Sequence, residues 1–281
     1  MRRAAEARER SRTPRVALVT GGTSGIGLAT ARRLGGDGFA VAITGRDLER
    51  GQGAERELRR VGVEARFVAA DARDSVAAAS VVREIESAWG RLDVLVASAG
   101  VGVVARVIDT PGQLVQEMLA TNVIGALVQV QACRALLGRS RPSAVVLVSS
   151  DSGIRGDVPL GAYSVTKAAV NMLGRMLALD LVEEGVRVNV VCPGDTIPGM
   201  RHMGTLADPE SSSSDPSRWT ATPMGRYADA DEVAAVIGFL SQSQSSYVNG
   251  AVLLVDGGAS AGMRGAAWEG FLRSPPELAD D

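Results

Sequence analysis

Tyr163 and Lys167 stand four residues apart in the run Tyr163-Ser164-Val165-Thr166-Lys167. Lys167 is the only lysine of the chain, although lysine and arginine together number 30. Lysine carries a compact ammonium and arginine a planar fork, so a lysine kept at one position of an arginine-rich chain indicates a need for the compact charge. If the segment is helical, the two side chains lie on one face.

A tyrosine beside an ammonium can do acid–base chemistry. The positive charge is expected to stabilise the tyrosinate and to lower the pKa of Tyr163 from its usual value of about 10. The pair could then donate and accept a proton near neutral pH. A solvated lysine that happens to follow a tyrosine would give the same pattern, so the pair needs support from other residues.

A second chemical signal is the glycine-rich run Thr20-Gly21-Gly22-Thr23-Ser24-Gly25-Ile26-Gly27. It follows a short apolar run and precedes a helical pattern, and in that context glycines let the backbone approach a pyrophosphate at a helix N-terminus. We therefore predict that a dinucleotide is bound by Gly21, Thr23, Ser24, Gly25, Ile26 and Gly27. A glycine-rich structural turn is the alternative.

Arg46 bears on which dinucleotide is bound. The next apolar run ends in Ile43-Thr44-Gly45-Arg46. Folds that prefer NAD place an acidic residue here for the ribose hydroxyls, and Gly45 cannot serve in that way. The fork of Arg46 can bind a 2′-phosphate, which favours NADP(H) as cofactor and leaves NAD(H) as the second choice. Alternatively, Arg46 is a solvated residue at the start of the next helix.

These residues need a scaffold in which strands and helices alternate. Apolar runs predict strands over residues 16–20, 39–44, 66–70, 92–97, 144–149, 186–192 and 251–255. Helical patterns predict helices over residues 25–34, 48–61, 75–89, 111–137, 162–183 and 231–240. The repeated order predicts an α/β protein: a single-domain doubly wound parallel sheet (Rossmann fold) of about seven strands, with helices on both faces.

Composition excludes several other classes of protein. The formal net charge is −2 and the pI about 5.7, so nothing points to nucleic acid or to an anionic membrane. No apolar run reaches about 18 residues, so no membrane span is expected. The single histidine, His202, cannot build a histidine-rich site, and we expect no metal. Cys133 and Cys192 lie far apart, which indicates reduced thiols and a cytoplasmic location.

The chain is expected to form one catalytic domain with two tails. We assign residues 15–260 to the nucleotide-binding domain, in which residues 195–228 are a substrate loop or lid that closes over bound cofactor. Residues 1–15 hold six arginines and two glutamates without an apolar stretch, which predicts a disordered basic tail over residues 1–14. A nucleic-acid-binding arm, a transit peptide and an upstream start codon are the alternatives. Residues 261–281 form a C-terminal tail.

In the order and spacing of its motifs, the chain resembles the short-chain dehydrogenase/reductase family over about residues 15–260. The glycine run fits T-G-x-x-x-G-x-G, Tyr163 and Lys167 fit Y-x-x-x-K, and Ser150 stands thirteen residues before Tyr163, as the family's serine does. Further matches are Asp71, Asn122, the turn Pro193-Gly194, and the closing run Val255-Asp256-Gly257-Gly258. The segment Ala97-Ser98-Ala99-Gly100 departs from the family's N-N-A-G and keeps only its last two residues.

The resemblance implies hydride transfer between NADP(H) and a ketone or secondary alcohol. Ser150 would donate a hydrogen bond to the substrate oxygen, and Tyr163 would act as general acid or base. Lys167 would lower the pKa of Tyr163 and hold the nicotinamide ribose, and Asn122 would position a water that relays protons to Lys167. Further cofactor contacts are implied for Asp71, Ala72, Ala99, Gly100, Pro193, Gly194 and Thr196, although the family's threonine usually falls a little later.

The substrate, a small carbonyl or alcohol compound, should bind at the carboxyl ends of the strands. Candidate wall residues are residues 101–104, residues 151–155 and, in the 195–222 loop, Met200, His202, Met203 and Trp219; each could instead serve packing. In this family the helices expected over residues 111–137 and 162–183 pair between subunits, which implies a homodimer or homotetramer. Packing within one chain is the alternative.

Two other functions share these motifs. One is a catalytically idle regulator that binds a dinucleotide, and the other is an epimerase or dehydratase that retains its cofactor. The four positions Asn122, Ser150, Tyr163 and Lys167 are all filled, which argues against an idle site.

Overall fold

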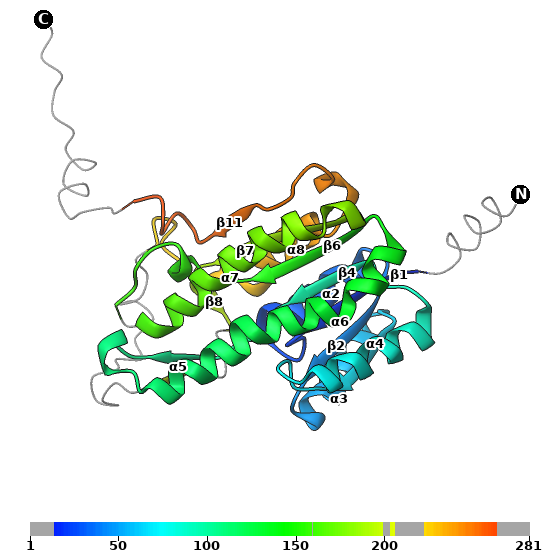
Figure 1. The fold of residues 1–281 in the computed structure, drawn as a ribbon, viewed down its shortest axis with the longest axis horizontal. Coiled ribbons are helices and arrows are strands. Elements are labelled where there is room, and N and C mark those ends of the chain that lie inside the picture. Colours follow the sequence, from blue (N-terminus) through cyan, green and yellow to red (C-terminus); the bar gives the residue numbers. More distant parts are fainter. Residues whose placement is uncertain (1–13, 159, 199–202, 206–221, 263–281) are drawn as a thin grey trace, which may run out of the picture.

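The computed structural model describes residues 14–158, 160–198, 203–205 and 222–262. Within them, strands and helices alternate from β1 (Arg15–Thr20) to β11 (Val252–Val255), and Figure 1 shows a sheet between two layers of helices. Every strand and helix expected from the sequence is present, within a few residues of its expected bounds. Nearly all of both expected tails lies outside the described residues, as do Met200, His202 and Trp219.

Seven parallel strands form the central sheet, in the order β11-β7-β6-β4-β1-β2-β3. The strands between the edges are β1, β2 (Phe39–Gly45), β4 (Val94–Ala97), β6 (Ser143–Val148) and β7 (Val186–Pro193), and β3 (Ala65–Ala69) is one edge. The chain runs outward from β1 to β3 and then returns to place β4 on the other side of β1. Doubly wound sheets bind their ligands at such a reversal, beyond the carboxyl ends of the strands.

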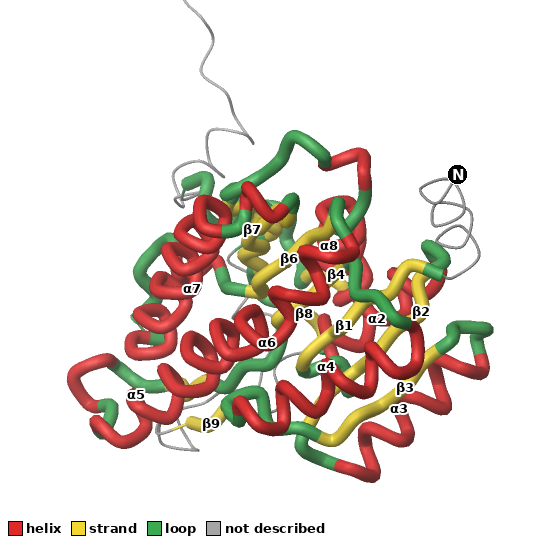
Figure 2. The backbone as a smooth tube through the Cα atoms, turned by 45° about the vertical axis from the view of Figure 1, so that its right-hand side comes forward, coloured by secondary structure: helices red, strands yellow, loops and turns green. Residues whose placement is uncertain are grey.

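Helices cover both faces of this sheet (Figure 2). One face carries α2 (Gly25–Gly36), α3 (Leu48–Arg60) and α8 (Ala230–Leu240), and the other carries α4 (Ser75–Trp89), α6 (Gly125–Ser140) and α7 (Gly161–Asp180). β1 contributes to both cores, because Val16 and Leu18 pack with the α4, α6 and α7 layer, whereas Ala17 and Val19 pack with the α2, α3 and α8 layer. A strand buried on both faces is apolar throughout, and that is why these strands could be predicted.

Acidic side chains fix where several helices begin. The Asp47 carboxylate accepts a hydrogen bond from the Arg50 amide at 3.0 Å and caps α3. Asp74 caps α4 by accepting from the amides of Val76 and Ala77 at 2.8 and 3.1 Å. α8 begins with a capping box between Asp229 and Glu232.

The helix expected over residues 111–137 is present but irregular. α5 (Gly112–Leu119) continues into α6 through a π-helical turn at Ala120–Ile124, and that turn contains Asn122. Such turns are frequent at functional sites. By length and a mean hydropathy of 1.2, Gly112–Ser140 also meets the criteria for a membrane span, the one such stretch in the described part of the chain. α6 packs Val130 and Cys133 into the core between the sheet and the layer of α4, α6 and α7. A core helix also meets the criteria for a membrane span, so this stretch is equally consistent with a core helix.

Four short strands were not expected from the sequence. β5 (Gly102–Val104) pairs with β9 (Met203–Thr205), and β8 (Thr196–Ile197) pairs with β10 (Ala228–Asp229). Segments of two or three residues are too short to show a hydrophobic period. The second of these pairs joins the two ends of the 195–228 segment next to β7.

Candidate functional site

A cavity of about 630 Å³ lies at the carboxyl ends of the central strands. Its wall contains all the residues expected to bind the cofactor, from Gly21 after β1 to Thr196 after β7, together with Ser150, Tyr163 and Lys167. Among the described residues, the expected catalytic residue Asn122 does not line it, and neither do residues 102–104 and 152–154 of the expected substrate wall. The fold thus brings distant segments of the chain to one place.

The β1–α2 loop lines one part of this cavity, called the cofactor half below. Gly21 has a φ of +66°, and a Cβ atom there would lie 2.8 Å from Cα of Ala99. A Cβ atom on Gly27 would lie 2.3 Å from the carbonyl oxygen of Gly21. Both positions therefore need glycine to bring the loop, the helix and the β4 end together. At Gly25 a Cβ atom would make an ordinary contact, 3.5 Å from the carbonyl oxygen of Pro198, but the φ of +52° favours glycine there.

The N-terminus of α2 offers hydrogen-bond donors to this half of the cavity. The amide of Leu28 donates to the Ser24 carbonyl at 3.1 Å and closes the first turn. The helical amides before it have no intrahelical partner, the Ser24 side chain makes no capping bond, and the first turn holds no acidic residue. The amides and the helix dipole can therefore bind an anion, and a pyrophosphate fits this donor set.

Arg46 lines the same half, beyond β2. Its neighbour Asp47 is engaged elsewhere, because it caps α3 and forms an ion pair with Arg50 at 3.2 Å. Within the described residues, no hydrogen bond or ion pair holds the Arg46 guanidinium. An uncommitted cationic fork suits a phosphate group better than ribose hydroxyls.

Asp71 follows β3 and also faces the cavity. Its carboxylate accepts hydrogen bonds from the Arg73 amide at 2.9 Å and from Nη2 of Arg73 at 2.7 Å. These bonds hold the pKa of Asp71 below its usual range. The next residue, Ala72, is fixed by Gln129, whose Nε2 donates to the Ala72 carbonyl at 3.0 Å.

The other half of the cavity contains Tyr163 and Lys167, both on α7 and only 5% and 3% exposed. Nζ of Lys167 donates to the carbonyl of Val148 at 3.0 Å and lies 5.5 Å from the centre of the Tyr163 ring. The Ser149 hydroxyl donates to the Lys167 carbonyl at 2.9 Å. These two hydrogen bonds hold α7 against the end of β6.

Burial dominates the acid–base properties of this pair. It raises the pKa of the Tyr163 phenol far above its usual value, and a hydrogen bond with Ser150 only partly opposes the rise. It lowers the pKa of Lys167 to about 8. The expectation that the ammonium lowers the pKa of Tyr163 is therefore not met in the free protein, because desolvation of the phenol raises that pKa and the negative charge of Asp151 adds to the rise.

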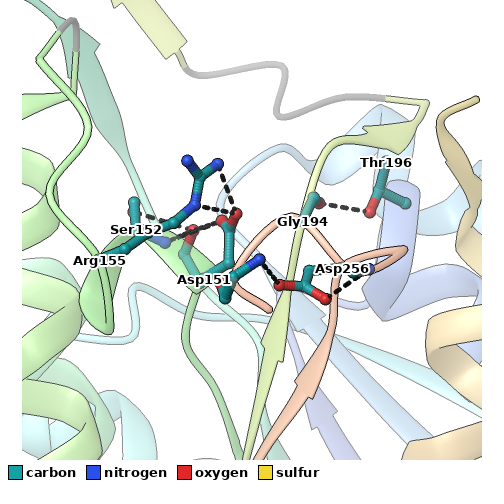
Figure 3. Close-up of polar contacts among 9 residues, drawn as sticks. Asp151, Ser152, Arg155, Gly194, Thr196 and Asp256 are labelled. Atoms are coloured by element: carbon teal, nitrogen blue, oxygen red, sulfur yellow. Dashed lines mark hydrogen bonds and ion pairs between the residues drawn. The ribbon is translucent and has the colours of Figure 1, made fainter. Parts of the chain in front are cut away.

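Ser150 begins a polar network at the end of β6. Its hydroxyl accepts from the amide and the hydroxyl of Ser152 at 3.2 and 2.9 Å and donates to Oδ1 of Asp151 at 3.1 Å. Oδ2 of Asp151 accepts from Nη2 of Arg155 at 3.2 Å. Figure 3 shows the Arg155 fork over the Asp151 carboxylate, near Gly194 and Thr196. Asp151 and Arg155 line the cavity, as expected for the 151–155 wall segment.

Asn122 is 2% exposed, and its side chain joins three elements. Oδ1 accepts from the Val101 amide, and Nδ2 donates to the Val101 carbonyl and to the Thr166 hydroxyl, all at 2.9 Å. Both amide protons are thus used within the protein. The side chain holds the π turn, the loop after β4 and α7 together beside Lys167, and it does not reach the cavity.

The Pro193-Gly194 turn rests on the closing turn of the chain. The Gly194 amide donates to the Val255 carbonyl at 3.0 Å, and a Cβ atom on Gly194 would lie 2.9 Å from Cα of Asp256. Asp256 in turn accepts from the amides of Gly258 and Ser260 at 3.0 and 2.8 Å. Thr196 donates to the Gly194 carbonyl at 2.8 Å, which keeps it at the cavity wall.

Several wall residues were not predicted from the sequence, among them Thr121, Asp157 and Leu160. The available signal for Asp157 and Leu160 was their position on the short segment between Ser150 and Tyr163. Both cysteines are buried free thiols. In the described ranges, no group of three or more His, Cys, Asp and Glu side chains is arranged to hold a metal.

Known proteins resemble the chain over most of its length. The family model described as enoyl-(acyl carrier protein) reductase matches residues 21–260. Cyclohexanol dehydrogenase of Rhodococcus sp. (strain TK6) is 35% identical over 262 residues, which cover 87% of this chain and 95% of the relative. The NADP-dependent (R)-specific alcohol dehydrogenase of Lentilactobacillus kefiri is 33% identical and covers 88% and 97%. The crystal structure of gox2181 has a TM-score of 0.80 at 30% identity, covering 89% of this chain and 97% of that chain.

Proposed function

Because the chain belongs to the short-chain dehydrogenase/reductase family of oxidoreductases, we propose that it transfers a hydride between NADP(H) and a ketone or secondary alcohol. One observation carries the proposal: Ser150, Tyr163 and Lys167 line the same cavity as the amides of α2 and Arg46. Groups for proton transfer and groups for binding a dinucleotide phosphate therefore face a shared space. The substrate is a small carbonyl or alcohol compound.

The residues that line the cavity can supply the proton and the hydrogen bond that this reaction needs. A bound nicotinamide supplies or takes up the hydride. In reduction, the carbonyl carbon receives the hydride with its two electrons, and the oxygen receives a proton from the Tyr163 phenol. Ser150 donates a hydrogen bond to that oxygen while negative charge builds on it. In oxidation, the alcohol would lose its O–H proton to the deprotonated Tyr163, which becomes the phenol again, and its C–H hydride to a bound nicotinamide.

Local geometry supports these roles. Since burial raises the pKa of Tyr163, the phenol is protonated at neutral pH and ready to donate. The Ser150 hydrogen points to Asp151 in the free protein and has to turn to the substrate oxygen, while Ser152 continues to donate to the Ser150 oxygen. Lys167 lies one turn beyond Tyr163 and would hold the nicotinamide ribose, with Asn122 positioning α7 through Thr166.

A screen of ketones and alcohols with NADPH and NADP⁺ tests this function, with Tyr163→Phe as the diagnostic variant. The variant should lose roughly 10²–10⁴-fold in turnover, because it lacks the proton donor. Its NADPH affinity, followed by nicotinamide fluorescence, should stay close to that of the wild type. Tyr247→Phe is the matched control, since Tyr247 is fully exposed and outside the cavity.

The alternatives give different results in the same screen. An idle regulator would bind NADPH and turn over no substrate, and an epimerase or dehydratase would show no net NADPH consumption. Turnover that survives in Tyr163→Phe would refute the role of that residue.

The preference for NADP(H) depends on Arg46. Replacing it with Ala removes a charge-assisted contact to the 2′-phosphate, which is worth about 1.5–3 kcal/mol, so KM for NADPH should rise about tenfold to a hundredfold. KM for NADH should hardly change. Arg56→Ala is the control, because Arg56 is exposed on α3, the helix that follows Arg46, and does not line the cavity. A wild-type preference for NADH would contradict this part of the proposal.

We extend the proposal to the wider organisation of the chain. Residues 15–260 form the catalytic domain of a cytoplasmic enzyme, and residues 195–228 form its substrate loop. The outward face of α7 carries Val165, Met172, Met176 and Leu179, which are 55%, 54%, 49% and 69% exposed. An apolar stripe of this kind supports pairing of subunits as a homodimer or homotetramer.

A further inference from the structure

We propose that the substrate half of the cavity selects neutral, hydroxyl-bearing carbonyl and alcohol compounds and disfavours anionic ones, through Asp151, Asp157 and Asp195. This inference rests on the proposed function and deepens it, because it states which substrates the same site accepts.

Three carboxylates line the cavity near Ser150 and Tyr163. Asp151 directly follows Ser150, Asp157 lies on the segment leading into α7, and Asp195 follows the Pro193-Gly194 turn. The remaining acidic residues of the wall, Asp47 and Asp71, follow β2 and β3 and belong to the cofactor half. The substrate half is therefore acidic along three separate segments.

Within the described residues, the two cationic side chains on this side, Arg155 and Lys167, already have hydrogen-bond partners. Arg155 directs Nε and Nη2 to the same oxygen of Asp151, at 3.4 and 3.2 Å, and the Asp151 side chain is only 11% exposed. Nζ of Lys167 is bound to the Val148 carbonyl. No hydrogen bond or ion pair among the described residues involves the side chains of Asp157 and Asp195. Arg155 pairs with Asp151, so within the described residues Asp157 and Asp195 are the two wall carboxyl groups of this side without an ion-pair partner, and the one ammonium of Lys167 offsets their charge only in part.

The charged groups of this wall also influence one another. Partial burial raises the pKa of both Asp157 and Asp195, and the negative charge of Asp151 adds to the rise at each. The positive charge of Arg155 opposes the rise at both groups, and at Asp157 its effect is larger than that of Asp151. A substrate carboxylate or phosphate would bring a further negative charge into this group and would be repelled. A substrate hydroxyl can instead donate to a carboxylate oxygen, a strong kind of hydrogen bond.

Three ring ketones of similar size separate the contributions of charge and hydrogen bonding: 4-hydroxycyclohexanone, 4-methylcyclohexanone and 4-oxocyclohexanecarboxylate. We expect kcat/KM with NADPH to fall in that order, by at least about tenfold from the hydroxyl to the carboxylate compound. A compound that is not turned over is compared by its inhibition constant against a ketone that the enzyme reduces.

The double variant Asp157→Asn/Asp195→Asn tests whether these residues cause the selection. The ratio of kcat/KM for the carboxylate ketone to that for the hydroxyl ketone should rise about tenfold, because two negative charges are removed at nearly constant volume. Asp180→Asn is the control, since Asp180 is exposed at the far end of α7 and does not line the cavity; it should leave the ratio unchanged.

Other outcomes would overturn the inference without touching the proposed function. A wild-type preference for the carboxylate ketone that disappears in Arg155→Gln would show that Arg155 anchors an anion. An equal ratio in the wild type and the double variant would show that the carboxylates play no part. Failure to reduce any ketone or oxidise any alcohol would instead refute the proposed function itself.

Discussion

At the scale of single residues, Lys167 combines a buried position with a charge. The residue is 3% exposed, and its ammonium donates to the carbonyl of Val148. Because burial disfavours the charged form, the pKa of Lys167 falls to about 8, close enough to neutral pH for the charge to depend on conditions. A guanidinium in this place would stay charged at every accessible pH and would need room for its fork.

Lys167→Arg should therefore lose most of the activity although it keeps the positive charge. The planar fork cannot reproduce one donor aimed at the Val148 carbonyl within a space that excludes solvent, so we expect a loss of at least about tenfold in kcat/KM. Arg175→Lys, an exposed exchange of the same two residue types on α7, is the control. Melting temperatures of both variants separate a lost site from a lost fold.

The pH dependence distinguishes the role of the ammonium from mere packing. As pH rises through about 8, free wild-type protein loses the Lys167 proton, so kcat/KM for ketone reduction should decline on the alkaline side. The residual activity of Lys167→Arg should lack this decline, because the guanidinium stays protonated. Near-normal turnover in the variant would mean that the site has no need for a lysine.

At the scale of elements, the β1–α2 loop depends on close backbone contact. Gly27→Ala would place a Cβ atom 2.3 Å from the Gly21 carbonyl oxygen, so the loop or the helix has to shift. We expect NADPH affinity to drop at least tenfold, measured by fluorescence titration, because the amides of α2 move away from the pyrophosphate. Gly36→Ala is the matched control at the other end of α2.

A Cβ atom on Gly36 would meet no heavy atom within 4 Å. That variant should bind NADPH normally and gain up to about 1 kcal/mol of unfolding free energy from the higher helix propensity of alanine. Normal NADPH binding by Gly27→Ala would show that the loop tolerates the displacement, contrary to our reading of its geometry.

The elements differ in how far the sequence predicts them. Strands such as β1 and β6 were predictable because burial on both faces makes them nearly continuous apolar runs. The π turn at Ala120–Ile124 was not, since the apolar pattern continues through it, and β5 is too short to show a period. Motif spacing located Ser150, Tyr163 and Lys167, but the bonds of Ser150 to Asp151 and of Asn122 to Val101 depend on how loops meet in space.

At the scale of the whole molecule, α7 has two different faces. Tyr163 and Lys167 lie on the inner face, and Val165, Met172, Met176 and Leu179 recur at helical spacing on the outer one. We expect the wild type to run as a dimer or tetramer in light scattering, and Met172→Glu/Met176→Glu to be a monomer at micromolar concentration. Val76→Glu, at an exposed position on α4, should leave the oligomer intact. A monomeric wild type would contradict this arrangement.

The position of β1 in the sheet also has a consequence for how the chain folds during its synthesis. β1 is the first strand of the described residues, yet it pairs on one side with β2 and on the other with β4, which ends at Ala97. Until the chain has been synthesised as far as Ala97, one edge of β1 has no strand to pair with. Unpaired edges of apolar strands can associate with other chains. The β1–α2 loop, whose amides would bind the cofactor phosphate, follows this same strand. The close contact between Gly21 of this loop and Ala99 can therefore form only after β4 has been synthesised.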